Sequence, residues 1–168
     1  MNQDAKKTVL RMIPYGLYVL TADDGKGNVG AATINFVTQS SFAPPLVTLG
    51  VKADSGAYHI LKETGAFALN VLGKDQKGAA FAFFKPAKVE GDKISGMAFT
   101  KGAATGAPLL TDAPAAIECR VRKIVEEGDH HVVIAEVVEA HLKNPITGRP
   151  DAATLEMKDL GDNVFYGG

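Results

Sequence analysis

Small hydroxyl and amide side chains that could hold a flat polar ligand gather in residues 28–47, a stretch that contains no charged residue. They are Thr33, Asn35, Thr38, Gln39, Ser40 and Ser41. Uncharged donors and acceptors of this size let backbone N–H and C=O groups approach a flat ligand closely. The Pro44-Pro45 step then restricts the backbone where the run ends. A strand followed by a Ser/Thr-rich turn without a ligand explains the same composition equally well.

A predicted helix start directly after the next strand could bind a phosphate. Asp54 or Ser55 is suited to cap a helix over residues 55–64, and Gly65 lies just past its end. The first N–H groups of a helix attract anions. Lys52 and His59 would add charge and donors there, and either Lys85 or Lys88 could reach an anionic ligand from a second helix end. Simple capping, with surface lysines that complement a helix dipole, is the alternative interpretation.

The histidines do not form a recognisable metal site. His59, His130, His131 and His141 lack the H-x-x-x-H or H-x-H spacing that places two ligands on one element. The pair His130-His131 follows Asp129 at an expected hairpin end, where an imidazole could bond to a ligand or simply face water. No serine lies in a G-x-S-x-G motif, so the hydrolase elbow is absent.

Composition and charge restrict the remaining possibilities. The 168 residues suit one domain over residues 1–168, and the net charge of −1 predicts no basic surface for nucleic acid. No apolar run approaches the ~20 residues of a membrane span, and the N-terminus lacks the features of a secretory signal. The single Cys119 excludes an intramolecular disulfide and suits a reducing cytoplasm. It lies on the apolar side of an alternating strand, which predicts a buried, unreactive thiol.

The elements that must position these residues are mostly strands. Alternation predicts six strands, at residues 15–22, 29–36, 46–51, 66–72, 115–126 and 132–142. Short helices are expected over residues 5–13, 55–64 and 74–84. The last two strands form a long hairpin. Antiparallel strands with so little helix suggest a closed or partly closed β-barrel.

The glycines of Gly25-Lys26-Gly27-Asn28-Val29-Gly30 match the dinucleotide fingerprint G-x-G-x-x-G, but the context differs. That fingerprint needs a helix at its last glycine, and here a second strand follows. We therefore interpret residues 23–28 as a hairpin turn, in which glycine supplies positive φ.

Three blocks in order along the chain resemble the flavin reductase-like family, whose fold is the FMN-binding split barrel. The blocks are GAATINFVTQSSFAPPLV, VKADSGAYHILKETGAFALNVLGKDQ and GAPLLTDAPAAIECRVRKIVEEGDHHVVIAEV. The resemblance covers residues from about 8 to 142, and AFFKPAKVEGDKISG is also similar to the flavin reductase modules of cyanobacterial diiron flavoproteins. It implies a mainly β fold, an antiparallel Greek-key barrel of about six strands with a few short flanking helices.

The resemblance also implies roles for individual residues. The cofactor-binding residues that it implies are Ala32, Thr33, Ile34, Asn35, Gln39, Ser40, Ser41, Lys52, Ser55, His59 and Lys85. Those from 32 to 41 would surround the flavin ring, and Lys52, Ser55 and His59 would lie toward its phosphate. His130 would position the nicotinamide. Many members have serine where Asn35 and Gln39 stand, and arginine near Asp54, whose carboxylate would repel a phosphate.

The activity implied is hydride transfer from NADH or NADPH to FMN or FAD, with no catalytic side chain. Electrons would pass to a monooxygenase, ferric iron or a redox protein, and a homodimer is expected to complete the flavin site. The alternatives are a flavoredoxin-like FMN protein that receives electrons from a protein donor, and a barrel that binds another ligand. Nothing in the sequence separates the first two, because both need the same pocket.

Overall fold

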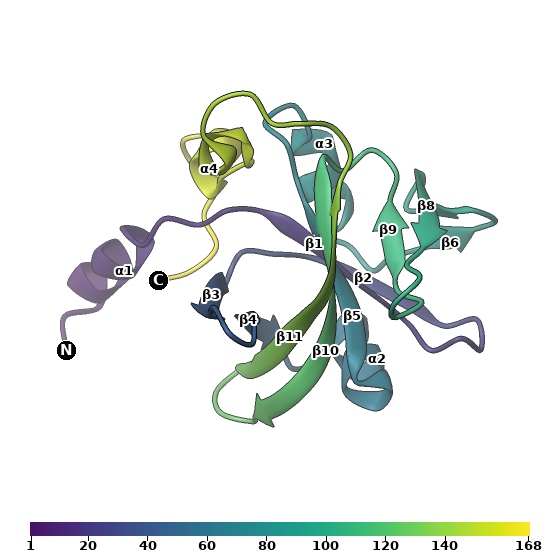
Figure 1. The fold of residues 1–168 in the computed structure, drawn as a ribbon. Helices are drawn as coiled ribbons and strands as arrows, with labels where there is room; N and C mark the ends of the chain where they lie inside the picture. Colours follow the sequence, from purple (N-terminus) through teal and green to yellow (C-terminus); the bar gives the residue numbers. More distant parts are fainter.

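The computed structural model describes residues 1–168 as a mainly β fold around one curled antiparallel sheet (Figure 1). The strands are β1 (Tyr18–Asp23), β2 (Val29–Ile34), β3 (Val37–Ser41), β4 (Leu46–Lys52), β5 (Ala66–Val71), β6 (Val89–Glu90), β7 (Lys93–Ile94), β8 (Met97–Lys101), β9 (Pro108–Leu110), β10 (Ala115–Val125) and β11 (His130–Leu142). The helices are α1 (Gln3–Arg11), α2 (Gly56–Thr64), α3 (Lys77–Ala82), α4 (Pro150–Ala153) and the 3-10 helix η1 (Met157–Leu160). None of the helices is long and apolar enough to cross a membrane.

The main sheet has seven strands in the order β2-β1-β5-β10-β11-β4-β3. Its two edges, β2 and β3, are consecutive in the chain, so the sheet curls until the short link at Asn35 and Phe36 joins them. Phe36 lies close to the sheet there, and its carbonyl accepts from the Gly50 amide at 2.9 Å. This open, curled sheet is the expected split barrel.

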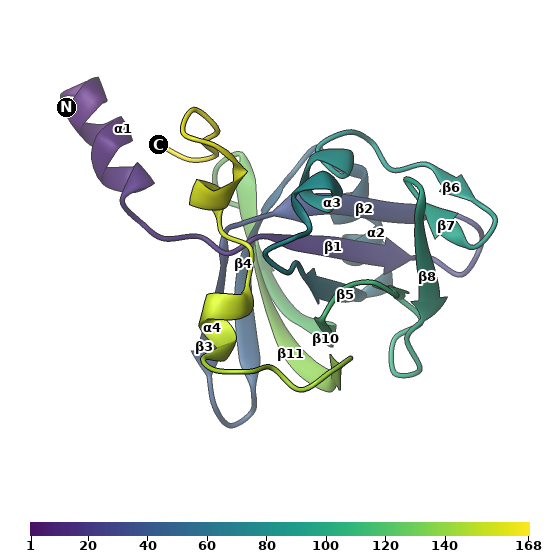
Figure 2. The same cartoon turned by 90° about the horizontal axis from the view of Figure 1, so that it is seen from above.

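The six strands predicted from alternation are all present, each within a few residues of its predicted ends. The hairpin of β1 and β2 pairs Asp23 with Val29 and turns through Gly25 and Gly27, both at positive φ, as expected. Five strands were not expected. The polar run includes a seventh strand of the main sheet, β3, and β6 to β9 form a small second sheet, visible at the right of Figure 2.

The alternation that predicted the strands also forms the core. Phe67, Leu69 and Cys119 are buried in the barrel interior with the apolar side of α2. The Cys119 thiol is buried as predicted, and desolvation raises its pKa to about 12, so it carries no reactive thiolate at neutral pH. A second cluster lies on the other side of the sheet, under α3 and η1.

Helix α2 lies against the barrel because of its cap and one glycine. Ser55 accepts a hydrogen bond from the Tyr58 amide at 3.2 Å, and Gly65 ends the helix in the left-handed conformation. A Cβ on Gly30 would lie 2.6 Å from the Cα of Ala57, so only glycine allows β2 and the start of α2 to approach so closely. The two elements that flank the candidate ligand region are therefore in direct backbone contact.

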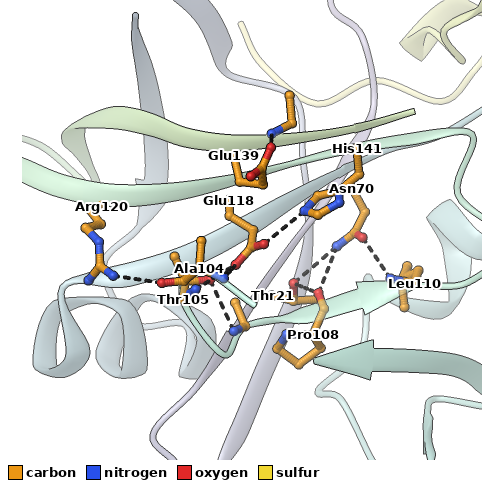
Figure 3. A network of polar contacts seen from close by, with 12 residues as sticks. Thr21, Asn70, Ala104, Thr105, Pro108, Leu110, Glu118, Arg120, Glu139 and His141 are labelled. Carbon is orange, nitrogen blue, oxygen red and sulfur yellow. Dashed lines mark hydrogen bonds and ion pairs between the residues drawn. The ribbon is translucent and has the colours of Figure 1, made fainter. Parts of the chain in front are cut away.

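A buried polar network attaches the small sheet to the main sheet (Figure 3). The carboxylate of Glu118 on β10 is fully buried and accepts from both N–H and hydroxyl of Thr105, each at 2.7 Å, and from Nε2 of His141 at 2.9 Å. The amide of Asn70 on β5 donates to the Val19 carbonyl and its oxygen accepts from the Leu110 amide at 2.8 Å. Buried polar groups satisfied in this way fix the relative position of the two sheets.

The two ends of the chain meet outside the barrel (Figures 1 and 2). Helix α1 buries none of its residues and extends away from the sheet. Arg11 at its end lies with its guanidinium carbon 4.2 Å from the ring centre of Phe165, and its Nε donates to the Gly167 carbonyl at 3.2 Å. The C-terminal residues thereby return to the side of the barrel where β2 and β4 end.

Candidate functional site

A cleft of about 560 Å³ opens between β2, the end of β4, the start of α2 and the segment after α3. This volume is typical of pockets for small ligands. Its lining comprises Val29 to Asn35, Gly50 to Lys52, Asp54 to Ala57, Phe83 to Ala87, His130 and Tyr166. Eight of the residues predicted from the sequence are brought together there: Ala32, Thr33, Ile34, Asn35, Lys52, Ser55, Lys85 and His130.

The β2 wall of the cleft is uncharged and held in place by the segment after α3. The Thr33 hydroxyl donates to the Ala80 carbonyl at 2.8 Å, and the Thr33 amide donates to the Phe83 carbonyl at 3.1 Å. Asn35 is buried and donates from Nδ2 to the Tyr166 carbonyl at 3.1 Å. Thr33 and Asn35 are therefore already bonded to protein carbonyls, so their shape and the adjacent small residues, rather than free polar atoms, define this wall.

The start of α2 supplies donors for an anion. Ser55 uses its side chain for the Tyr58 amide, so the amides of Gly56 and Ala57 are left without an intrahelical partner where they line the cleft. No side chain projects from Gly56 to cover them. An anion at this position would meet N–H groups and the positive end of the helix dipole.

The charges around this helix start are unevenly paired. Lys52 forms an ion pair with Asp54 at 3.0 Å, and the hydrogen bond between them raises the pKa of the lysine and lowers the pKa of the aspartate. Lys85 lines the cleft and forms no ion pair. Lys85 is thus the free cation of the cleft, whereas Lys52 must share its charge with a carboxylate.

His130 lies at the rim with both ring nitrogens bonded. Its Nδ1 is 2.9 Å from Oδ1 of Asp129, and the hydrogen bond between them lowers the pKa of that carboxyl group. Its Nε2 is 2.8 Å from the Tyr166 hydroxyl, and its ring packs edge-on against Phe36. His131 points to the other side of the strand, where its Nδ1 is 2.6 Å from the Tyr58 hydroxyl. The two histidines therefore lie on opposite sides of the strand, and only His130 borders the cleft.

Four predicted site residues lie outside the lining of the cleft. Gln39, Ser40 and Ser41 belong to the edge strand β3, where Ser40 bonds to Thr48 across to β4. His59 is exposed on α2 and packs edge-on against Tyr58. Pairing of the polar run with β4 turns these side chains away from the β2 wall, so a flavin contact would need the ligand or a second subunit to reach them.

Tyr166 is the lining residue farthest along the chain among those that sequence reasoning missed. It lies 131 residues from Asn35 and 36 from His130, and it bonds to both. Burial raises the pKa of its hydroxyl, so the group stays protonated at neutral pH. A lone tyrosine near a chain end has no local pattern that could have indicated this position.

The chemistry available in the cleft is binding and orientation. No group of three or more His, Cys, Asp or Glu side chains converges to hold a metal ion. The cleft offers a flat uncharged wall, amide donors beside a lysine, and an imidazole at the rim. These groups suit an aromatic ligand that carries a phosphate and brings its own reactivity.

Comparison with known proteins gives a consistent result. The model of the flavin reductase like domain matches residues 10–156. A probable flavin reductase of Rhizobium meliloti (strain 1021) is 33% identical over 122 residues, which are 73% of this chain and 38% of that protein. Diflavin flavoprotein A 1 of Synechocystis sp. is 32% identical over 143 residues, which are 84% of this chain and 24% of that protein. The chain thus spans well under half the length of these two relatives.

A solved structure supports the same family. The NADH:FAD oxidoreductase SgcE6 of Streptomyces globisporus C-1027, in complex with NAD and FAD fragments, is 32% identical with a TM-score of 0.68. The match covers 77% of this chain and 76% of that one. Together with the family match over most of the sequence and the split-barrel fold, this shows that the chain belongs to the flavin reductase-like family.

Proposed function

We propose that the cleft binds FMN or FAD and that this chain is an NAD(P)H-dependent flavin reductase. The observation that carries the proposal is the conjunction, in one cleft, of the uncharged β2 wall, the free amides at the start of α2 and Lys85. A flavin has a flat polar ring and a phosphate, and these two parts match the two halves of the cleft. Membership of the family and the solved NADH:FAD oxidoreductase support the assignment.

The residues of the cleft fit this cofactor in size and charge. Gly30, Ala31 and Ala32 have side chains small enough to let a ring approach the β2 backbone. The amides of Gly56 and Ala57, with Lys52 and Lys85, would hold the phosphate. When bound, the flavin supplies the redox chemistry, because its ring accepts the hydride.

The chain's own residues would bind the flavin and orient the nicotinamide against it. His130 lies at the rim of the cleft, where an imidazole can bond to the carboxamide of a nicotinamide. Holding the two rings in stacking contact makes the transfer effectively unimolecular. Gln39, Ser40 and Ser41 remain proposed contacts to the polar edge of the ring, and His59 remains a proposed contact on the phosphate side.

Two further properties are part of the proposal. A homodimer is supported by apolar residues left exposed on α1 and by Phe42 beside β3. The acceptor would be a monooxygenase, ferric iron or a redox protein, with the chain in the cytoplasm. An FMN-holding electron carrier is the second candidate, favoured by the match to a small part of a diflavin flavoprotein.

The visible spectrum of the purified protein tests the ligand, and anaerobic mixing tests the reaction. We expect bound flavin, or quenching of added FMN fluorescence at micromolar concentrations, and bleaching of that flavin by NADH or NADPH. A protein that binds flavin without bleaching would be the electron carrier. A colourless protein that leaves FMN fluorescence unchanged would contradict both candidates.

A further inference from the structure

The C-terminal strap, residues 161–168, lies between two cavities. Tyr166 lines the cleft described above, and it also lines a second cleft of about 430 Å³. The second cleft is bounded by the strap, the segment from Arg11 to Tyr15, and residues 156–158. The Tyr166 side chain thus borders free volume on both sides of the strap.

Hydrogen bonds and ring contacts hold the strap, and Tyr166 packs against the rings of Phe36 and His130. Asn35 donates to the Tyr166 carbonyl, and Arg11 donates to the Gly167 carbonyl while its guanidinium packs on Phe165. Phe165 is 52% exposed and Tyr166 is 41% exposed. Gly161 and Gly167 bound the segment with φ values of 142° and 120°, where glycine turns most freely. These side chains are more exposed than those of the sheet, so the strap opens at lower cost than the sheet.

Both ring nitrogens of His130 are engaged, one by Asp129 and one by Tyr166 of the strap. A carboxylate only accepts, so the proton on the ring lies on Nδ1, which faces Asp129. In the neutral imidazole Nε2 is then an acceptor, and the Tyr166 hydroxyl, 2.8 Å away, donates to it. No polar atom of this ring remains for a nicotinamide while Tyr166 is in place.

We propose that Tyr166 gates the nicotinamide side of the cleft by competing with the substrate for Nε2 of His130. The proposal rests on the proposed function, because it assigns the entry route to the same site. A nicotinamide carboxamide carries N–H donors that can replace the hydroxyl at Nε2. The tyrosine then swings toward the second cleft, and it returns to His130 when the nucleotide leaves. Tyr166 is thus a positioning residue that acts on the substrate through His130.

Removing one hydroxyl tests the gate. The flavin-loaded Tyr166→Phe variant should reach half-saturation at an NADH or NADPH concentration about two- to tenfold lower than the wild type needs, because one competing hydrogen bond is lost. The limiting rate of flavin bleaching should not change. In a His130→Ala background, Tyr166→Phe should have no further effect. Tyr58→Phe, which removes the hydroxyl bonded to the adjacent His131 on the other side of the strand, is the matched control and should leave both quantities unchanged.

Binding of the oxidised nucleotides NAD⁺ and NADP⁺ tests the gate without hydride transfer. Tyr166→Phe should tighten this binding by the same factor, and added nucleotide should speed amide exchange in residues 162–168. Equal or weaker binding by the variant, or slower exchange in the strap, would overturn the gate. If the wild type binds nucleotide more weakly than Tyr166→Phe but never bleaches its flavin, the reductase proposal fails and the gate stands. If the flavin of the wild type bleaches and Tyr166→Phe binds nucleotide with the same affinity as the wild type, the gate fails and the reductase proposal stands.

Discussion

Asp54 is the only carboxylate on the lining of the cleft, and it faces the place where a phosphate is proposed. It forms an ion pair with Lys52, so the lysine charge is partly neutralised before any ligand arrives. A negative group beside a phosphate also repels it directly. The Lys52–Asp54 ion pair should therefore weaken the binding of an anion at this position.

We expect Asp54→Asn to tighten FMN binding by a factor of about two to five, in line with exposed ion pairs. The gain should shrink as salt is added, because screening weakens exposed charges. Fluorescence titration measures it. Riboflavin, which lacks the phosphate, is the ligand control, and Asp4→Asn on α1 is the protein control. An equal gain for riboflavin would show that the charge does not act on the phosphate.

The two adjacent histidines allow a matched comparison. His130→Ala should slow flavin reduction by about two- to tenfold, the effect of one positioning hydrogen bond, with flavin affinity nearly unchanged. His131→Ala should leave the reduction rate unchanged, because His131 faces Tyr58 on the other side of the strand. Stopped-flow bleaching gives both rates. A slower His131 variant beside a normal His130 variant would mean that the nicotinamide lies elsewhere.

At the scale of elements, Glu118 holds the small sheet to the long hairpin of β10 and β11 (Figure 3). Burial raises the pKa of its carboxyl group, but hydrogen bonds from Thr105, His141 and Ala104 lower it by more, so the native pKa lies below the usual value. A carboxylate with a depressed native pKa stabilises the fold above its unfolded pKa of about 4.3. That stability is lost as the pH falls through the native pKa.

Glu118→Gln should therefore lower the free energy of unfolding at pH 7 by about 1–3 kcal/mol, because charged hydrogen bonds are weakened. Its stability should also fall less steeply than that of the wild type below about pH 4. Urea unfolding at several pH values measures both effects. Glu139→Gln is the control, since Glu139 pairs with Glu118 in the ladder but is exposed. Parallel pH profiles for the wild type and Glu118→Gln would refute this role.

For the molecule as a whole, α1 and the two residues after it present exposed apolar side chains. Val9 on α1 and the following Met12 and Ile13 are 61%, 74% and 48% exposed. Exposed apolar side chains gathered on one helix are typical of an interface. This geometry supports the proposed homodimer, with α1 as part of the contact.

Light scattering should therefore give twice the chain mass of 17.6 kDa. The double variant Val9→Lys and Met12→Lys should shift the protein toward a monomer, because charges replace the apolar face. Lys7→Gln, on the opposite side of the helix, should leave the mass unchanged. A dimer that persists in the double variant would place the interface elsewhere, and a wild-type monomer at all concentrations and flavin loadings would refute the homodimer.

Features that depend on neighbours along the chain could be predicted from the sequence. Alternation specified six strands, Ser55 and Gly65 specified the ends of α2, and the glycines of the first hairpin specified a turn. The burial of Cys119 followed from the same alternation. These features are local because backbone geometry and side-chain direction repeat with the period of the element.

Local patterns did not indicate which of those elements share a cleft, and the grouping of Thr33, Ser55 and His130 was expected from the family resemblance alone. The polar run 37–41 became an edge strand because β4 was available to pair with it, and this separated Gln39, Ser40 and Ser41 from the β2 wall. Tyr166 reached His130 and Asn35 because the sheet curls and the chain end returns to its open side. Such contacts depend on strand order and packing over long chain separations, which no local pattern encodes.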